Sequence, residues 1–368
     1  MMKINDDKRI VMTLDAGGTN LVFSAIRGGK AVTETITIPS EVNDLQRLLK
    51  KLSDGFEQVK AQCPEPPVAI SFAFPGPADY PRGIIGDLGN LPCFRGGIPL
   101  GPILEAQFGI PVYINNDGDL FVYGEAIAGF LPYVNDLLDK AGSPKRFKNL
   151  FGITLGTGFG GGIVRNNELF IGDNSMAGEI WLLRNKLDPQ MNAEEGACIR
   201  AIQRTYALEA SVPFEDAPDP RVIEEIARGD VPGNQNAAKE AYRRFGEVVG
   251  DALGNALTLI DGLAVIGGGL SKGHALFLPE IVSELNSCYT GPKGNRFHRL
   301  ASRVFNLEDS EQRDAFLKGE KKEITLPGSA EKIQYDPLQR LGIGISRLGT
   351  SEAVAIGAYA FALNKLDQ

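Results

Sequence analysis

Two glycine-rich turns in this 368-residue chain each lie between apolar runs, and both have the composition of a phosphate-binding loop. Glycine lets backbone N–H groups approach phosphate oxygens closely, and threonine and asparagine side chains add further donors. The residues predicted to contact phosphate are Asp15, Gly17, Gly18, Thr19 and Asn20 in the first turn and Gly156, Thr157 and Gly158 in the second. A plain hairpin turn is the alternative for the first segment, and a flexible loop is the alternative for the second.

The second turn contains the pattern G-x-G-x-x-G at Gly156, Gly158 and Gly161. In a dinucleotide-binding site this pattern opens a helix, whose N-terminus receives the pyrophosphate. Here Gly162 leads into the apolar run 163–165 and then a polar turn, which predicts a strand and a hairpin. The dinucleotide interpretation is therefore rejected, and a phosphate-cradling hairpin that matches the first one is favoured.

Acidic and amide side chains supply the remaining chemistry. Asp15, at the end of the first strand, can hold Mg²⁺ directly or through water. Asp117 follows the apolar run 112–114 and opens a predicted helix, where its carboxylate can orient an attacking hydroxyl and accept its proton, as phosphoryl transfer requires. Asn116 can bind neighbouring hydroxyls. Both residues are also common helix N-caps, which is the structural alternative.

Two further carboxylates, Glu179 and Glu194, are candidates for sugar recognition, because one carboxylate can accept hydrogen bonds from two vicinal hydroxyls. An exposed glutamate that is only solvated is the alternative for each.

The elements that must position these residues are predicted from hydrophobic periodicity and turn residues. Strands are expected at 10–14, 21–26, 31–38, 68–74, 112–114, 150–155, 163–165, 169–171 and 262–266. Helices are expected at 41–62, 100–108, 119–128, 193–209, 219–228, 236–259 and 351–365. Each half of the chain thus opens with a strand, a glycine-rich turn and a returning strand. This twofold organisation predicts two α/β domains.

Composition narrows the class of protein. The net charge of −8 argues against a nucleic-acid or membrane-surface partner, since both need a basic face. The four cysteines are scattered and form no C-x-x-C pair, which is typical of reduced thiols in a cytoplasmic protein. The start of the chain is polar and shows no signal peptide, so a cytoplasmic location is expected.

Taken together, these motifs resemble the ROK family of sugar kinases and repressors, across nearly the whole chain except about 290–334. The resemblance implies the two-domain actin-like ATPase (ribonuclease H-like) fold, with the active site in the interdomain cleft. It also implies ATP and Mg²⁺ as cofactors and a homodimer. Segments 15–20 and 155–162 are similar to the family's two phosphate loops, and the resemblance places Gly267, Gly268 and Gly269 beside the adenosine. It assigns the catalytic base to Asp117 and sugar contacts to Asn90, Asn116, Glu179 and Glu194.

The chain departs from the family pattern in one string. Glu179 resembles the glutamate of G-E-x-G-H, but the last two positions are Trp181 and Leu182. The missing histidine binds sugar and leads the family's zinc-binding cysteine cluster, and no cysteine follows before Cys198. A zinc site is therefore not expected, and the sugar pocket should differ from that of glucose-type members. The helix-turn-helix of the repressor members is not expected either.

The resemblance implies a small N-terminal α/β domain at 1–125, on which the C-terminal helix 351–368 packs back. It implies a large α/β domain at 126–350, with a probable insertion at about 290–334. The predicted function is ATP-dependent phosphorylation of a hydroxyl of a hexose or hexosamine-type sugar. A catalytically weak, sugar-sensing regulatory protein of the same fold is the main alternative, favoured by the missing histidine and opposed by Asp15 and Asp117. A phosphatase of the same superfamily is the third.

Overall fold

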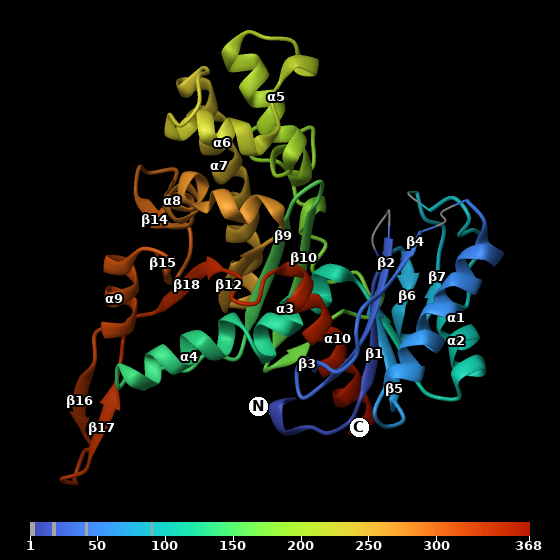
Figure 1. Ribbon diagram of the computed structural model, residues 1–368. Coiled ribbons are helices and arrows are strands. Elements are labelled where there is room, and N and C mark those ends of the chain that lie inside the picture. The colour runs from blue at the N-terminus through green and yellow to red at the C-terminus, as the bar shows by residue number, and fades with distance from the viewer. Residues whose placement is uncertain (1–3, 17–19, 41–42, 90) are drawn as a thin grey trace. The chain divides into compact units, whose positions relative to one another are not determined.

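A computed structural model describes residues 4–16, 20–40, 43–89 and 91–368 (Figure 1). The chain divides into two compact units. The first comprises residues 1–129, 162–178 and 348–368, and the second comprises residues 130–161 and 179–347. Among the described residues, no helix is long and apolar enough to cross a membrane.

The first unit is built on a six-stranded sheet in the order β3-β2-β1-β5-β8, with β4 also paired to β2. Its strands are β1 (Val11–Ala16), β2 (Asn20–Arg27), β3 (Lys30–Ala31), β4 (Ile36–Pro39), β5 (Ala69–Ala73) and β8 (Val112–Asn115). Strand β1 is antiparallel to β2 and parallel to β5, and β5 is parallel to β8. The carboxyl ends of β1, β5 and β8 therefore lie at one edge, which is where ligands bind in open α/β sheets.

Helices pack on this sheet in two groups. Helix α1 (Leu45–Gln62) contributes Phe56 to a core with Phe23 of β2 and Phe72 of β5, at ring separations of 5.0 and 5.9 Å. Helix α2 (Leu100–Phe108) joins the same core. Helices α3 (Asp117–Ile127) and α10 (Thr350–Leu366) pack along each other and against the strands. Their contact is close because Gly124 and Gly357 each face the other helix's backbone, where a side chain would collide. Two short strands, β6 (Ala78–Asp79) and β7 (Ile84–Ile85), pair with each other and complete this part.

The second sheet has the order β11-β10-β9-β12-β18-β15. Its strands are β9 (Leu150–Leu155), β10 (Phe159–Arg165), β11 (Glu168–Leu169), β12 (Leu263–Gly267), β15 (Arg303–Asn306) and β18 (Arg340–Ile345). Strands β9, β12, β18 and β15 are mutually parallel neighbours. The helices of this part are α4 (Phe130–Lys140), α5 (Ile199–Ala210), α6 (Pro220–Arg228), α7 (Gln235–Ile260), α8 (His274–Leu285) and α9 (Ser310–Lys318). Two hairpins, β13 (Cys288–Thr290) with β14 (Arg296–His298) and β16 (Lys322–Thr325) with β17 (Lys332–Tyr335), lie outside the sheet.

The structure corrects three expectations about the elements. The strand expected at 31–38 is two strands, β3 and β4, because the hydroxyl of Thr33 accepts the N–H of Ala25 at 3.0 Å and interrupts the ladder. Helices α4 and α8 were not predicted, since each contains a proline. Pro132 lies in the first turn of α4, where proline is tolerated, and Pro279 is accommodated inside α8. Strand β15, within the segment expected to be an insertion, is an edge strand of the sheet.

Candidate active site

Asp15 and Asn20 flank the first glycine turn at the ends of β1 and β2, and both are exposed. The register pairs Asp15 with Val22 and Ala16 with Leu21, which is the last pair of this ladder among the described residues. Gly17, Gly18 and Thr19 lie outside the described residues, as does Asn90. The two flanking side chains are thus the described part of the first predicted phosphate site.

Asp117 is the first residue of α3, immediately after β8 and the N-cap Asn116. The backbone N–H of Gly118 donates to both Oδ1 of Asn116 and Oδ1 of Asp117, each at 2.8 Å. The N-terminal end of a helix favours a carboxylate there. Asn116 can therefore cap the helix while Asp117 acts as the predicted base. The N–H of Gly118 orients Oδ1 of Asp117 and leaves Oδ2 for a ligand.

The pKa of Asp117 is raised above its usual range. Loss of hydration is the largest cause, because protein atoms surround the carboxylate even though it keeps surface accessible to solvent. The hydrogen bonds from backbone N–H groups oppose this effect, and the negative charge of Asp15 adds to it. Asp15 is therefore close enough to influence the proton affinity of Asp117. A higher pKa makes Asp117 a better proton acceptor than an ordinary aspartate.

The two carboxylates fit a Mg²⁺–nucleotide complex. Mg²⁺ takes oxygen ligands and is usually held by one or two carboxylates together with substrate phosphates. Asp15 is exposed, and no hydrogen bond or ion pair joins it to another described residue. Elsewhere in the described chain, no group of three or more His, Cys, Asp or Glu side chains is arranged to hold a metal ion.

The second glycine turn connects β9 to β10 in the second unit, and its carbonyls are all engaged. The N–H of Ile199, at the start of α5, donates to the carbonyl of Gly156 at 2.9 Å. Arg200 donates from Nη1 to the carbonyl of Thr157 at 3.1 Å, and the N–H of Gly156 donates to the carbonyl of Gly158 at 3.0 Å. The N–H groups of Thr157 and Gly158 have no hydrogen-bond partner among the described residues. Successive N–H groups of this kind form an anion-binding cradle.

A cluster of four charged side chains stabilises this turn, namely Glu194, Glu195, Arg200 and Arg204. Glu194 accepts the N–H of Phe159 at 3.0 Å, and Arg200 lies 3.5 Å from Glu194 and 3.3 Å from Glu195. Arg204 completes the cluster with a 2.7 Å ion pair to Glu195. The hydrogen bonds from Arg204 are the largest influence on Glu195 and help to hold its pKa below its usual range. The carboxylate of Glu194, predicted to bind sugar, is thus directed at the backbone of the phosphate turn.

The third glycine segment lies beside the second. Gly267 ends β12 and pairs with Thr154 of β9, so the two turns follow the same edge of the sheet. Gly268 has a φ of +85°, and a Cβ there would collide with the backbone of Leu155. Gly269, by contrast, faces open space. This arrangement brings Gly156, Gly158 and Gly267–Gly269 together within the second unit.

Glu179 lies at the start of a short helical turn, Ile180–Leu182. The indole N–H of Trp181 donates to Oε2 of Glu179. Leu182, where the family pattern has histidine, is exposed. One carboxylate oxygen of Glu179 is therefore engaged by Trp181, and the other is the oxygen left for a ligand.

Sequence reasoning missed Arg200 and Arg204, and it missed that Glu194 bonds the turn's backbone. These contacts join residues about forty positions apart in sequence, so no local pattern reveals them. The only signal was the pair of glutamates at 194 and 195, followed by arginines at 200 and 204.

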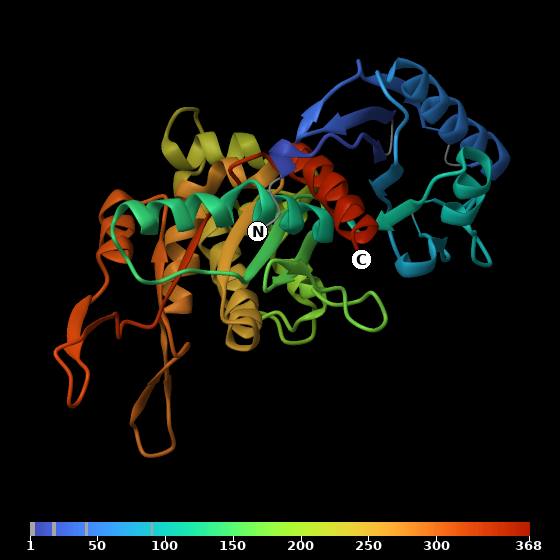
Figure 2. The same cartoon turned by 90° about the horizontal axis from the view of Figure 1, so that it is seen from below.

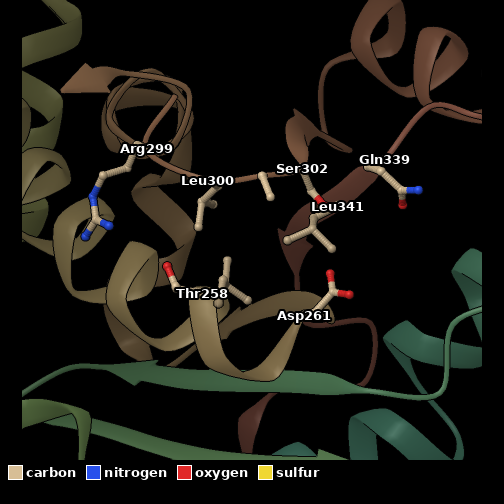
Figure 3. A pocket seen from close by; sticks show the side chains of 9 residues that line it. Thr258, Asp261, Arg299, Leu300, Ser302, Gln339 and Leu341 are labelled. Carbon is tan, nitrogen blue, oxygen red and sulfur yellow. The ribbon is translucent and has the colours of Figure 1, made fainter. Parts of the chain in front are cut away.

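A separate cavity of about 340 Å³ lies between the end of α7, segment 299–302 and β18 (Figure 3). Leu300 and Leu341 face its centre, with Thr258 and Asp261 at its edge. Arg299 is directed to α7, where it bonds Asp251 and Asn255. None of the predicted site residues lines this cavity.

Comparisons with known proteins identify relatives of this chain. The chain is 27% identical to an N-acetyl-D-glucosamine kinase of Vibrio vulnificus, over 72% of this chain and 85% of the relative. It is 50% identical to a glucokinase from Parabacteroides distasonis, whose crystal structure matches 99% of both chains with a TM-score of 0.91. A ROK family glucokinase from Streptomyces griseus, solved with glucose and AMPPNP, is 18% identical and shares the fold (TM-score 0.59; 95% of this chain and 98% of that one). The fold is therefore the actin-like ATPase fold of these kinases. The model of the ROK family matches residues 11–306, and the chain belongs to the ROK family.

Proposed function

We propose that this ROK sugar kinase transfers the γ-phosphoryl group of ATP to a hydroxyl of a hexose or hexosamine-type sugar. The proposal rests on the hydrogen bonding of the turn Gly156–Gly158. All three carbonyls of this turn accept hydrogen bonds, whereas the successive N–H groups of Thr157 and Gly158 have no partner among the described residues. Such a cradle suits the phosphates of a nucleotide, because it offers donors that need no reorganisation. Gly267–Gly269, on the same edge, would border the rest of the nucleotide.

Asp117 accepts the proton of the attacking sugar hydroxyl. Its raised pKa and its fixed Oδ1 both suit that role. In a loose phosphoryl-transfer transition state, orienting the hydroxyl matters more than early proton removal. The hydroxyl oxygen forms a bond to the γ-phosphorus as the bond to the β-phosphate oxygen breaks, and ADP leaves.

Asp15 would hold Mg²⁺ directly or through water, and Asn20 and the residues between them would contact the phosphates. When bound, the ion neutralises charge on the phosphates.

Sugar recognition falls to Asn90, Asn116 and Glu179. The N-cap bond occupies Oδ1 of Asn116, so its Nδ2 donates to a sugar hydroxyl. Glu179 accepts through the oxygen that Trp181 leaves available. The names of two relatives, a glucokinase and an N-acetyl-D-glucosamine kinase, support a hexose or an N-acetylated hexosamine as the acceptor.

The test is ADP release with ATP-Mg and a panel of hexoses, hexosamines and N-acetylated hexosamines. We expect release well above the sugar-free background with one or a few sugars. Release that is independent of sugar would indicate an ATPase instead. No release, with one sugar still raising the melting temperature, would favour the sugar-sensing alternative.

A further inference from the structure

Glu179 and Glu194 each belong to a short helical turn, and one loop joins the two turns. Glu179 directly precedes η3 (Ile180–Leu182), and Glu194 lies in η4 (Ala193–Gly196). Both turns pack on α7 within the second unit (Figure 2). The loop 183–192 therefore connects the carboxylate proposed to bind sugar with the carboxylate that bonds the second glycine turn.

The two arms of this loop are hydrogen-bonded to each other. The N–H of Ala193 donates to the carbonyl of Leu183 at 2.6 Å, and the N–H of Asn185 donates to the carbonyl of Met191 at 3.1 Å. Asn185 is only 4% exposed, and its Oδ1 accepts two backbone N–H groups of the residues that follow, at 2.9 and 3.2 Å. Such contacts fix a turn locally. A shift of the loop would therefore move η3 and η4 together.

Lys186 attaches the loop to two helices. Its Nζ lies 2.9 Å from Oε1 of Glu247 on α7 and 2.7 Å from Oε2 of Glu284 on α8. The three side chains are 35%, 22% and 12% exposed, so salt and water screen these pairs less than pairs on the open surface. Loss of hydration would lower the pKa of Lys186, but its hydrogen bonds to both carboxylates outweigh that effect and raise the pKa. Lys186 is thus a cation held between α7 and α8.

Arg243 offers an internal comparison, because it shares one of these carboxylates. It pairs with Glu240 at 2.7 Å and with the same Glu247 at 3.0 Å, and all three residues lie on α7. The pairs of Arg243 thus stay within one helix, whereas those of Lys186 cross from the loop to two helices. The two cations differ in whether they hold the loop.

We propose that Lys186 is a positioning residue of the sugar kinase, whose ion pairs fix the loop that orients Glu179 and Glu194. The inference rests on the proposed function, in which Glu179 binds sugar and the turn bonded by Glu194 receives the phosphates of ATP. Lys186 acts through these two carboxylates and not on either substrate directly. A loosened loop displaces both carboxylates at once, so the binding of sugar and of ATP weakens together.

The test compares Lys186→Met with Lys186→Arg in steady-state kinetics. Methionine removes the cation, and we expect the KM for sugar and the KM for ATP each to rise about fivefold, from the loss of two partly exposed ion pairs. The kcat should stay within about twofold of the wild-type value, because a loss of uniform binding raises KM alone. Arginine can pair with both carboxylates, so K186R should keep both KM values within about twofold of wild type.

Arg243→Met is the matched control. It removes two ion pairs, one of them to Glu247, but leaves the loop attached, so both KM values should stay at the wild-type level. Glu284→Gln removes one of the two pairs of Lys186 and should raise both KM values less than K186M does. Equal rises in K186M and R243M, a rise in only one KM, or no recovery in K186R would each overturn the proposal.

A second measurement needs no turnover. Trp181, the only tryptophan in the chain, lies in η3, so acrylamide quenching of its fluorescence reports how firmly that turn is held. Quenching should increase in K186M and stay at the wild-type level in K186R and R243M, with thermal melting showing that each variant is folded. A wild type that releases no ADP with any sugar would defeat the proposed function, whereas unchanged quenching in K186M would defeat the role of Lys186.

Discussion

A hydrogen bond of 3.0 Å joins the carboxylate of Glu194 to the backbone N–H of Phe159, at the end of the second glycine turn. A Cβ on Gly158 would lie only 2.8 Å from the same carboxylate. The turn therefore passes directly against Glu194, and a side chain at position 158 would displace that carboxylate. This contact favours a role in shaping the phosphate cradle over the sugar contact that the family resemblance implies.

The first prediction concerns that role. Glu194→Ala leaves the Phe159 N–H unpaired and removes a partner of Arg200, so we expect the KM for ATP to rise about tenfold, from one lost hydrogen bond to a charged group. The KM for sugar should change little. Glu194→Gln, which keeps an acceptor oxygen, is the matched control and should be milder. A larger effect on the sugar KM would instead identify Glu194 as a sugar ligand.

The second prediction concerns Asp117. Asp117→Asn removes the proton acceptor but keeps an oxygen for the Gly118 N–H, so turnover should fall by about 10²–10⁴-fold while the fold is retained. Because loss of hydration disfavours the charge of Asp117 and raises its pKa, removing the charge should also raise the melting temperature at pH values where the wild-type carboxylate is ionised. Asp54→Asn, at an exposed residue paired with Lys50, is the control and should not stabilise. A destabilised D117N would contradict this account.

The direction of the pKa shift of Asp117 also predicts how the stability difference between D117N and wild type depends on pH. The folded pKa of Asp117 lies above the unfolded value of about 4, so the charge costs stability at high pH and nothing at low pH. The melting advantage of D117N should therefore grow as the pH rises and vanish as the pH falls toward about 4. In the wild type, kcat/KM should fall as the pH drops through the same raised pKa. An advantage that grows in acid would refute the assignment.

The third prediction uses Trp181, the only tryptophan in the chain. Its indole N–H donates to Glu179, so a sugar that contacts Glu179 changes the environment of the fluorophore. Adding the acceptor sugar without ATP should shift the intrinsic fluorescence in a saturable way, and a sugar that supports no turnover should not. Glu179→Gln should weaken that response about tenfold. A saturable response that is unaltered in E179Q would place the sugar away from Glu179.

Local sequence patterns were sufficient to predict the elements whose hydrophobic residues recur with a regular period. Helix α2 at 100–108 and strand β9 at 150–155 were predicted with the bounds that the structure has. The second glycine turn lies between β9 and β10, as its residue types and the flanking apolar runs predicted. The hydrogen bond from Arg200 to the carbonyl of Thr157 was not predicted, because it depends on how α5 packs against the second sheet. Likewise, α8 was not predicted, because Pro279 disfavours a helix in the sequence pattern. The helix forms because it packs on α7.

The fourth prediction tests the buried ion pair at the base of the β16–β17 hairpin. Asp336→Ala leaves the buried Arg340 without its carboxylate and should cost about 3–5 kcal/mol of unfolding free energy. Glu323→Ala, which breaks the exposed pair with Lys332, should cost less than about 1 kcal/mol. Chemical denaturation of both variants measures this difference.

The same pair sets a pH dependence of opposite sign. Burial alone would raise the pKa of Asp336, but hydrogen bonds from Arg340 and from two backbone N–H groups outweigh it and hold the pKa low. The stabilisation is then complete above the unfolded value of about 4 and is lost as the pH falls through the folded value. The gap between D336A and wild type should narrow in acid, and a constant gap would contradict the charge assignment.

Phosphorus NMR of the reaction mixture tests the central claim most directly, because it detects the transferred phosphoryl group itself. With ATP-Mg and the acceptor sugar, wild type should convert the γ-phosphate signal into a sugar phosphate ester, in step with ADP. Asp117→Ala should bind the sugar and form ester at least about 10²-fold more slowly. Appearance of inorganic phosphate in place of the ester, or equal rates in both proteins, would contradict the proposed kinase and its base.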